Sequence, residues 1–222
     1  MTRDERNRID SPDYHDYVIK DGRLIGEFDQ MYRKSQEVPW HQDDARRRLD
    51  CQLAAAMVRQ YGPFRRVLEV GSGLGYFADM LAEAAEAESL LGVDVSPEAV
   101  RRASTLFPAL QFETADVMRP GVTRGRTYAL VAIRGTFWYV FPEIDQVVEN
   151  LTAFTAPGGW LLVSQNFPPL DSEFVGKAVI PTPERLVDRF RPGFDIVCKV
   201  YLESQQQDSK NDNWILFLAR KR

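Results

Sequence analysis

The sequence contains few residues that typically bind metal ions, with two cysteines and two histidines in 222 residues. Cys51 and Cys198 lie far apart in the chain, and His15 and His41 form no cluster with them. A protein-built zinc site needs about four such ligands at short spacings, and a disulfide framework needs more cysteines. We therefore predict no metal site, and we interpret the cysteines as ordinary thiols of a cytoplasmic protein.

The sequence also lacks the hydrophobic segments that membranes require. The opening residues, MTRDERNRID, have no apolar core of the kind found in a secretory signal. The best apolar stretch, residues 128–141, is interrupted by Arg134 and is shorter than the roughly 18 residues of a membrane span. These absences predict a protein with no membrane partner.

Positive charge is not in excess. The chain has 28 Lys and Arg against 32 Asp and Glu, which gives a formal net charge of -4. Binding to nucleic acid through its phosphates needs a basic face. The cluster Arg46-Arg47-Arg48 stands at the start of an expected helix, where a charge run is typically a solvated face. We therefore predict no nucleic-acid partner.

From about residue 45 onward, strand and helix patterns alternate. Strands are predicted over residues 66–70, 90–93, 110–114, 128–133 and 160–165, and helices over 45–60, 76–88, 142–155 and 183–189, with a further helix after Ser96. Residues 194–203 and 214–220 read as two strands that flank a polar loop. This pattern predicts an α/β fold with a doubly wound, Rossmann-like sheet, mostly parallel, and an antiparallel hairpin at its C-terminal edge. Ligands of such sheets bind beyond the carboxyl ends of the strands.

Residues 1–44 do not follow this alternation. They are rich in aromatic residues, which is unusual for a disordered tail. We therefore divide the chain into two parts. Residues 1–44 are expected to form an ordered, partly helical lid over the ligand crevice, and residues 45–222 the ligand-binding domain.

The stretch VLEVGSGLGYF, residues 67–77, reads as a buried strand that runs into a glycine turn. A phosphate-binding P-loop needs Lys and then Ser or Thr after its last glycine, but Gly75 is followed by Tyr76. A dinucleotide fingerprint needs a sixth-position glycine where Tyr76 stands. Glu69, just before the glycines, would repel a pyrophosphate and suits a ligand that carries an ammonium group.

This stretch resembles the first motif of class I S-adenosylmethionine-dependent methyltransferases. Three more motifs follow in order: LLGVDVS with Asp94, FETADV with Asp116, and LTAFTAPGGWLLVS before the fifth strand. The resemblance covers residues 65–166. It implies S-adenosylmethionine as the cofactor, S-adenosylhomocysteine as the product, and methyltransferase activity.

The resemblance also implies roles for single residues. Glu69 would bind the cofactor's ammonium, Asp94 the ribose hydroxyls and Asp116 the adenine amino group. The predicted cofactor-binding set is Glu69, Gly71, Ser72, Gly73, Gly75, Asp94, Val95, Asp116, Val117 and Arg134. Plain alternatives stand beside these roles: Asp94 as a helix cap, Asp116 as a turn residue, and the two valines as core.

Residues 25–43, IGEFDQMYRKSQEVPWHQD, resemble more loosely the entry segment of small-molecule methyltransferases of the nodulation N-methyltransferase kind. This resemblance implies a small-molecule acceptor. The residues predicted to line the acceptor pocket are Tyr32, Trp40, Trp138, Tyr139, Gln165 and Asn166. As aromatic residues in a row, Trp138 and Tyr139 are equally typical of a core.

Two residues are candidates for the chemistry itself. Arg134, at a strand end, is expected to orient an anionic acceptor or the cofactor's carboxylate, or else to pair with a nearby acid. His41 follows the rigid pair Pro39-Trp40, and histidine is the type of side chain that most often takes the proton of a hydroxyl acceptor at neutral pH. The alternative for His41 is a surface or capping residue.

The sequence thus predicts methyl transfer to an oxygen or nitrogen atom of a small molecule, with a sugar or secondary metabolite as the expected class. One alternative is a non-catalytic domain that binds S-adenosylmethionine and regulates a partner. A nicotinamide-dependent reductase is disfavoured by Tyr76 and Glu69. The oligomeric state is left open.

Overall fold

The computed structural model describes residues 11, 13–119, 121–203 and 213–222. Most of the predicted polar hairpin loop and the first ten residues of the predicted lid lie outside this part. The helices are α1 (Phe28–Lys34), α2 (Leu49–Tyr61), α3 (Tyr76–Ala85), α4 (Pro97–Leu106), α5 (Phe137–Val140), α6 (Ile144–Phe154) and α7 (Pro183–Phe190). Short 3-10 segments span Tyr14–Tyr17, Pro39–Asp44 and Phe141–Glu143. The strands are β1 (Ile19–Lys20), β2 (Arg23–Leu24), β3 (Arg66–Val70), β4 (Ser89–Asp94), β5 (Gln111–Thr114), β6 (Tyr128–Arg134), β7 (Thr155–Phe167), β8 (Phe194–Leu202) and β9 (Asn213–Lys221).

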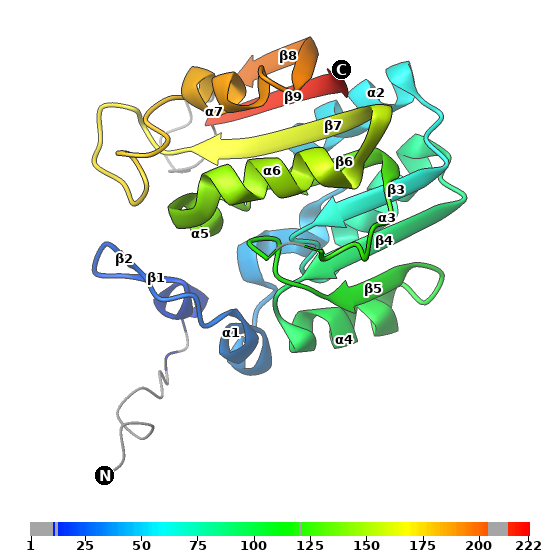
Figure 1. The fold of residues 1–222 in the computed structure, drawn as a ribbon. Coiled ribbons are helices and arrows are strands. Elements are labelled where there is room, and N and C mark those ends of the chain that lie inside the picture. Colours follow the sequence, from blue (N-terminus) through cyan, green and yellow to red (C-terminus); the bar gives the residue numbers. More distant parts are fainter. Residues whose placement is uncertain (1–10, 12, 120, 204–212) are drawn as a thin grey trace.

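Seven strands form one sheet in the order β5-β4-β3-β6-β7-β9-β8 (Figure 1). The pairings from β5 to β7 are parallel, and β9 pairs antiparallel with both β7 and β8. The predicted fold class and the hairpin at the sheet edge are confirmed. Within that hairpin the antiparallel strand β9 is inserted between β7 and β8, so the outermost strand β8 runs in the same direction as β7.

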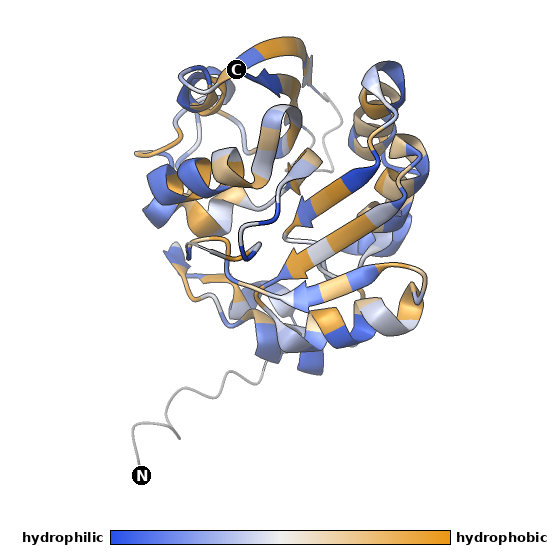
Figure 2. Ribbon diagram, turned by 45° about the vertical axis from the view of Figure 1, so that its right-hand side comes forward, coloured by the Kyte–Doolittle hydropathy of each residue, from blue (hydrophilic) through white to orange (hydrophobic). Residues whose placement is uncertain are grey.

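The sheet has a hydrophobic core on each face, because successive side chains of a strand point to opposite sides. Leu68 of β3 belongs to the core under α5, α6 and α7, whereas its neighbour Val67 belongs to the core under α2 and α3. In Figure 2 the central strands are mostly orange and the blue residues gather on the helices. Parallel strands that are buried on both faces require this composition.

Among the boundaries that differ from the prediction, those of α2 and β7 shift the most. The helix expected from residue 45 begins at Leu49, because Arg48 has an extended backbone (ψ 130) directly before it. The predicted turn Pro157-Gly158-Gly159 lies inside β7. There the pairing jumps from Tyr128–Thr155 to Leu130–Trp160, so the turn is retained as an irregularity within the strand.

The described part of residues 1–44 lies beyond the carboxyl ends of the parallel strands (Figure 1). Its helix α1 packs against α4. Tyr17 and Met31 form a third buried cluster with Leu74 of the glycine turn and Ala99 of α4. The segment is therefore joined to the domain through a small core of its own.

Candidate functional site

The glycine turn after β3 is fixed to the end of β4 by hydrogen bonds. The N–H groups of Gly71 and Ser72 both donate to the carbonyl of Val93, at 2.8 and 3.0 Å. The N–H of Gly73 donates to Oδ2 of Asp94 at 2.9 Å. The turn is thus a rigid platform at the edge of the sheet where ligands of this fold class bind.

The three glycines of the turn are required by the protein's own packing. All three have positive φ angles (72, 52 and 85°), which side chains disfavour. A Cβ at Gly71 would collide with Oγ1 of Thr136, and one at Gly73 with the amide of Gln42. A Cβ at Gly75 would come within 2.7 Å of the Phe112 ring.

Asp94 closes the turn from the β4 side. Besides the bond from Gly73, its Oδ1 accepts a hydrogen bond from the N–H of Ser96 at 2.9 Å. Ser96 in turn caps α4 by accepting from the N–H of Ala99. Burial raises the pKa of Asp94, and the backbone N–H donors oppose that shift. The cap of α4 is thus Ser96, while Asp94 joins the glycine turn to that cap.

Glu69 is a buried carboxylate with only 2% exposure. Its Oε2 has no hydrogen-bond partner within the described residues. Burial raises its pKa well above the ordinary value, an effect that Arg134 opposes and Asp94 reinforces. A buried polar oxygen without a partner is costly, so this position fits a ligand that brings a donor or a positive charge.

Arg134 is paired with an acid, which is one of the two roles predicted for it. Its Nε and Nη2 donate to Oδ2 of Asp50 at 2.8 and 2.6 Å. Asp50, at the start of α2, was not predicted as a site residue, because an acid in the first turn of a helix is common on a solvated face. Here its side chain is only 4% exposed.

The N-terminal segment contacts the turn directly. Oε1 of Gln42 accepts a hydrogen bond from the N–H of Leu74 at 2.8 Å, and its Nε2 donates to the hydroxyl of Tyr32 at 3.0 Å. Tyr32 is buried and lies beside Gly73. Gln42 is not predicted from the sequence, since a glutamine in a polar stretch carries no signal for this long-range contact.

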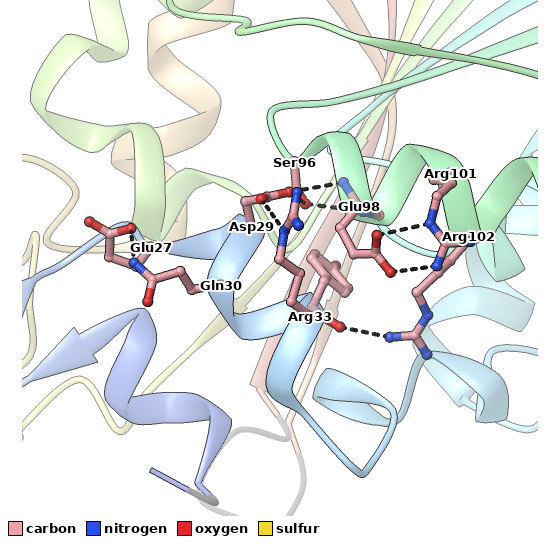
Figure 3. A network of polar contacts seen from close by, with 10 residues as sticks. Glu27, Asp29, Gln30, Arg33, Ser96, Glu98, Arg101 and Arg102 are labelled. Carbon is pink, nitrogen blue, oxygen red and sulfur yellow. Dashed lines mark hydrogen bonds and ion pairs between the residues drawn. The ribbon is translucent and has the colours of Figure 1, made fainter. Parts of the chain in front are cut away.

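A second connection joins α1 to the start of α4 (Figure 3). Oδ1 of Asp29 accepts hydrogen bonds from the N–H of Glu98 at 2.9 Å and from the hydroxyl of Ser96 at 3.1 Å. Nη1 of Arg102 donates to the carbonyl of Tyr32 at 3.0 Å. An acid at a helix N-terminus accepts N–H groups that have no partner within the helix.

The predicted acceptor-pocket residues fall into two groups. Trp40 lies between Tyr32 and Tyr139, with ring centroids 6.3 and 5.7 Å away, so these three are brought together. Trp138 packs on Phe167 in the core.

Trp138 also belongs to a polar network at the end of β7. Its Nε1 donates to the carbonyl of Asn166 at 2.9 Å. Gln165 accepts from the N–H of Phe137 at 3.0 Å and donates to the Asn166 side chain at 3.0 Å. Trp138, Gln165 and Asn166 thus hold α5 against β7.

The other predicted residues occupy varied surroundings. Val95 is 46% exposed, and Val117 is buried in the core under α6. Oδ1 of Asp116 accepts from the N–H of Met118 at 2.9 Å, which builds a turn. His41 is exposed, and both it and Trp40 have left-handed backbones (φ 49 and 55°).

No group of three or more His, Cys, Asp or Glu side chains within residues 11, 13–119, 121–203 and 213–222 is arranged to hold a metal ion. In the same residues, no helix has the length and apolar character to cross a membrane.

Comparison with known proteins agrees with this geometry. Residues 68–161 match the family model of a methyltransferase domain. The chain is 26% identical over 102 residues to Methyltransferase str2 of Strobilurus tenacellus, and 35% identical over 104 residues to Ribosomal protein L11 methyltransferase of Geobacter sp. (strain M21). These matches cover 46 and 44% of this chain but 36 and 31% of the relatives, so the chain spans about a third of their length.

The fold is similar to that of solved structures over most of the chain. N-methyltransferase NodS from Bradyrhizobium japonicum WM9, in complex with S-adenosyl-L-homocysteine, superposes with a TM-score of 0.72 at 19% identity. The superposition covers 87% of this chain and 97% of that one. At this level of identity the likeness concerns the fold.

Proposed function

We propose that the protein transfers the methyl group of S-adenosylmethionine to an oxygen or nitrogen atom of a small molecule, and the match of residues 68–161 to the family model of a methyltransferase domain supports this proposal. The observation that carries the proposal is Oε2 of Glu69, a buried carboxylate oxygen with no partner in the described chain. An ammonium group such as the cofactor's would satisfy it. A pyrophosphate would be repelled, which argues against a nicotinamide cofactor.

Four groups of this chain suit the rest of the cofactor. Each carboxylate oxygen of Asp94 accepts one backbone N–H and keeps further acceptor capacity for the ribose hydroxyls. Asp116 lies one strand further along the same edge, where the adenine amino group is expected. Val95 and Val117 directly follow Asp94 and Asp116 in the chain, and the exposed side chain of Val95 offers an apolar surface for a ring.

The cofactor supplies a methyl group on a sulfonium, which is already activated for attack. The protein's contribution is then chiefly to place the acceptor in line and to keep water away. The aromatic group Tyr32, Trp40 and Tyr139 stands beside the glycine turn and suits one wall of an acceptor site. We assign the N-terminal segment the role of a lid on this basis.

For a hydroxyl acceptor we assign His41 as the base. His41 directly follows Trp40 of this aromatic group in the chain, and both residues have left-handed backbones. His41→Gln keeps similar size and removes the base, so turnover should fall about 100-fold while affinity for S-adenosylhomocysteine is unchanged. Full turnover by this variant on a hydroxyl acceptor would remove His41 from the mechanism.

Calorimetry and a transfer assay test the proposal. The protein should bind S-adenosylhomocysteine at micromolar strength and show no heat with NADH. Radiolabelled S-adenosylmethionine offered with a panel of sugars, phenols and amines should then label at least one small product. Binding of NADH in place of S-adenosylhomocysteine would refute the proposal, and cofactor binding without transfer to any acceptor would favour the regulatory alternative.

A further inference from the structure

Glu69 and Arg134 are neighbours in the sheet that do not pair. Glu69 of β3 lies opposite Ala132 of β6, and Arg134 stands two residues further along β6. Residues two apart on a strand point to the same face, so the carboxylate and the guanidinium share the face under α2. Even so, the guanidinium bonds to Asp50, and Oε2 of Glu69 is left without a partner among the described residues.

The position of Arg134 is fixed from several sides. Oδ2 of Asp50 takes both donors, and Oδ1 accepts from Nε of Arg48 at 3.1 Å, so both oxygens of this carboxylate are engaged. The Arg134 guanidinium also lies over the Trp214 ring at 4.8 Å and over Phe77 at 5.7 Å. Only 17% of the Arg134 side chain is exposed. This arrangement holds the positive charge on the α2 side of the sheet.

We propose that Asp50 is a positioning residue that holds Arg134 away from Glu69 and thereby leaves the Glu69 carboxylate free for the ammonium group of the ligand. The inference rests on the proposed function, and it gives that function a second layer of residues. Without the Asp50 carboxylate, the strongest acceptor within reach of the guanidinium is Glu69, and a bidentate pair of this kind would compete with the ligand.

The local charge leads to the same conclusion. With Glu69 ionised against a cationic ligand, the two carboxylates Asp50 and Glu69 balance the two guanidinium groups of Arg48 and Arg134 that bond to Asp50. Asp50→Asn makes this group one charge more positive, so the attraction for an ammonium is weakened even where the fold is kept. Asp50→Asn with Arg134→Gln restores the wild-type net charge and removes the guanidinium that would pair with Glu69.

The test compares two ligands that differ by the amino-acid group. S-adenosylhomocysteine carries the ammonium, whereas 5′-methylthioadenosine keeps the adenosine and the thioether without it. In Asp50→Asn, the affinity for S-adenosylhomocysteine should fall at least 10-fold, while that for 5′-methylthioadenosine changes less than about twofold. The double variant Asp50→Asn, Arg134→Gln should regain most of the preference for S-adenosylhomocysteine.

Each outcome decides the matter. The inference is overturned if Asp50→Asn loses affinity equally for both ligands, or if its preference for S-adenosylhomocysteine is unchanged. It is also overturned if the double variant lacks that preference. If Asp50→Asn does not fold, the double variant decides alone, because it leaves no unpaired charge at positions 50 and 134. A wild-type protein that binds neither ligand would refute the proposed function itself, whereas a wild-type preference that Asp50→Asn retains would refute only this inference.

Discussion

Glu69 and Asp94 are both buried carboxylates, yet their surroundings differ in what they offer a negative charge. Asp94 accepts N–H groups from Gly73 and Ser96, so its charge is stabilised by the backbone before any ligand arrives. Glu69 has an oxygen without a partner in the described part of the chain. Asp94 therefore stabilises the glycine turn and keeps acceptor capacity for a ligand, whereas the unpaired oxygen of Glu69 can gain a partner from a bound ligand.

Asp94→Ala should affect both binding and stability. The N–H of Gly73 would lose its acceptor inside the protein, which costs about 1–3 kcal/mol of unfolding free energy. Affinity for S-adenosylhomocysteine should fall roughly 10- to 1000-fold through the lost hydroxyl bonds. Calorimetry and denaturant unfolding measure the two effects, and Asp94→Asn, which keeps one acceptor oxygen, should be intermediate. An unchanged dissociation constant beside lowered stability would limit Asp94 to the turn.

Glu69 should make the ligand-free protein less stable as the pH rises. Burial raises its pKa above the ordinary value of 4.5, against the opposing charge of Arg134 and with the help of Asp94. Above pH 4.5 the Glu69 side chain loses its proton in the unfolded chain but keeps it in the folded protein. The free energy of unfolding therefore falls as the pH rises, until the pH exceeds the raised pKa of the folded state. Glu69→Gln should therefore be more stable than wild type, by a margin that grows with pH over this window.

Thermal melts between pH 4.5 and 8 check this expectation, with Glu113→Gln as the control because Glu113 is a half-buried acid on β5 outside the turn. Glu69→Gln should also lose the preference for S-adenosylhomocysteine over 5′-methylthioadenosine. A variant that is less stable than wild type across the window would contradict the assignment of Glu69 as an unsatisfied acid.

The sequence predicts the residues of the glycine turn well, because a left-handed turn after a buried strand needs glycine wherever it is found. It does not predict Asp50, Gln42 or Asp29. Each of these makes its contact with a residue that is 32 to 84 positions away. In the sequence each is one polar residue in a polar stretch, and only the packed fold shows which side chains it reaches.

At the scale of elements, the cap of α4 joins two parts of the molecule. Ser96 closes the first turn of α4 from within the domain, and Asp29 of α1 adds a second acceptor from the N-terminal segment. The N-terminus of a helix favours a negative charge, so the carboxylate is well placed. Docking of α1 is thus linked to the start of the helix that follows Asp94.

Asp29→Ala should loosen the N-terminal segment. We expect a loss of about 0.5–2 kcal/mol of unfolding free energy, as for a lost helix cap, and faster hydrogen exchange in residues 28–34. Arg101→Ala is the matched control, since it removes an exposed ion pair with Glu98 at the same helix end and should cost little. Unchanged exchange over α1 would show that the buried cluster of Tyr17 and Met31 alone holds this segment.

The strand after residue 65 and the helix before it differ in how well their bounds can be predicted. The strand at Arg66–Val70 was predicted with the bounds that it has, because buried β-branched and aliphatic runs end abruptly at polar residues or glycine. The predicted start of α2, at residue 45, lies four residues before the observed start at Leu49, since residues 45–48 include good helix formers. The preceding 3-10 segment, whose Gln42 bonds to the turn, directs the chain away from a helix there.

For the whole molecule, the strand β9 is a main source of stability. Phe217 is fully buried under α7, with its ring 5.6 Å from Phe190. Phe217→Ala should lower the unfolding free energy by about 3–5 kcal/mol, measured by denaturant titration. Tyr201→Ala on the neighbouring strand β8 is the control, because its side chain is 42% exposed and the change should stay within about 0.5 kcal/mol. Equal effects of the two variants would contradict this assignment.

The place of β9 between β7 and β8 also sets an order of assembly. In the sheet, β8 borders β9 alone, and β9 borders both β7 and β8. Residues 194–202 therefore cannot join the sheet until residues 213–221 have reached β7, although they are made earlier on the ribosome. Either β9 adds first or the hairpin adds as one unit, and until then the edge of β7 is left open to other strands.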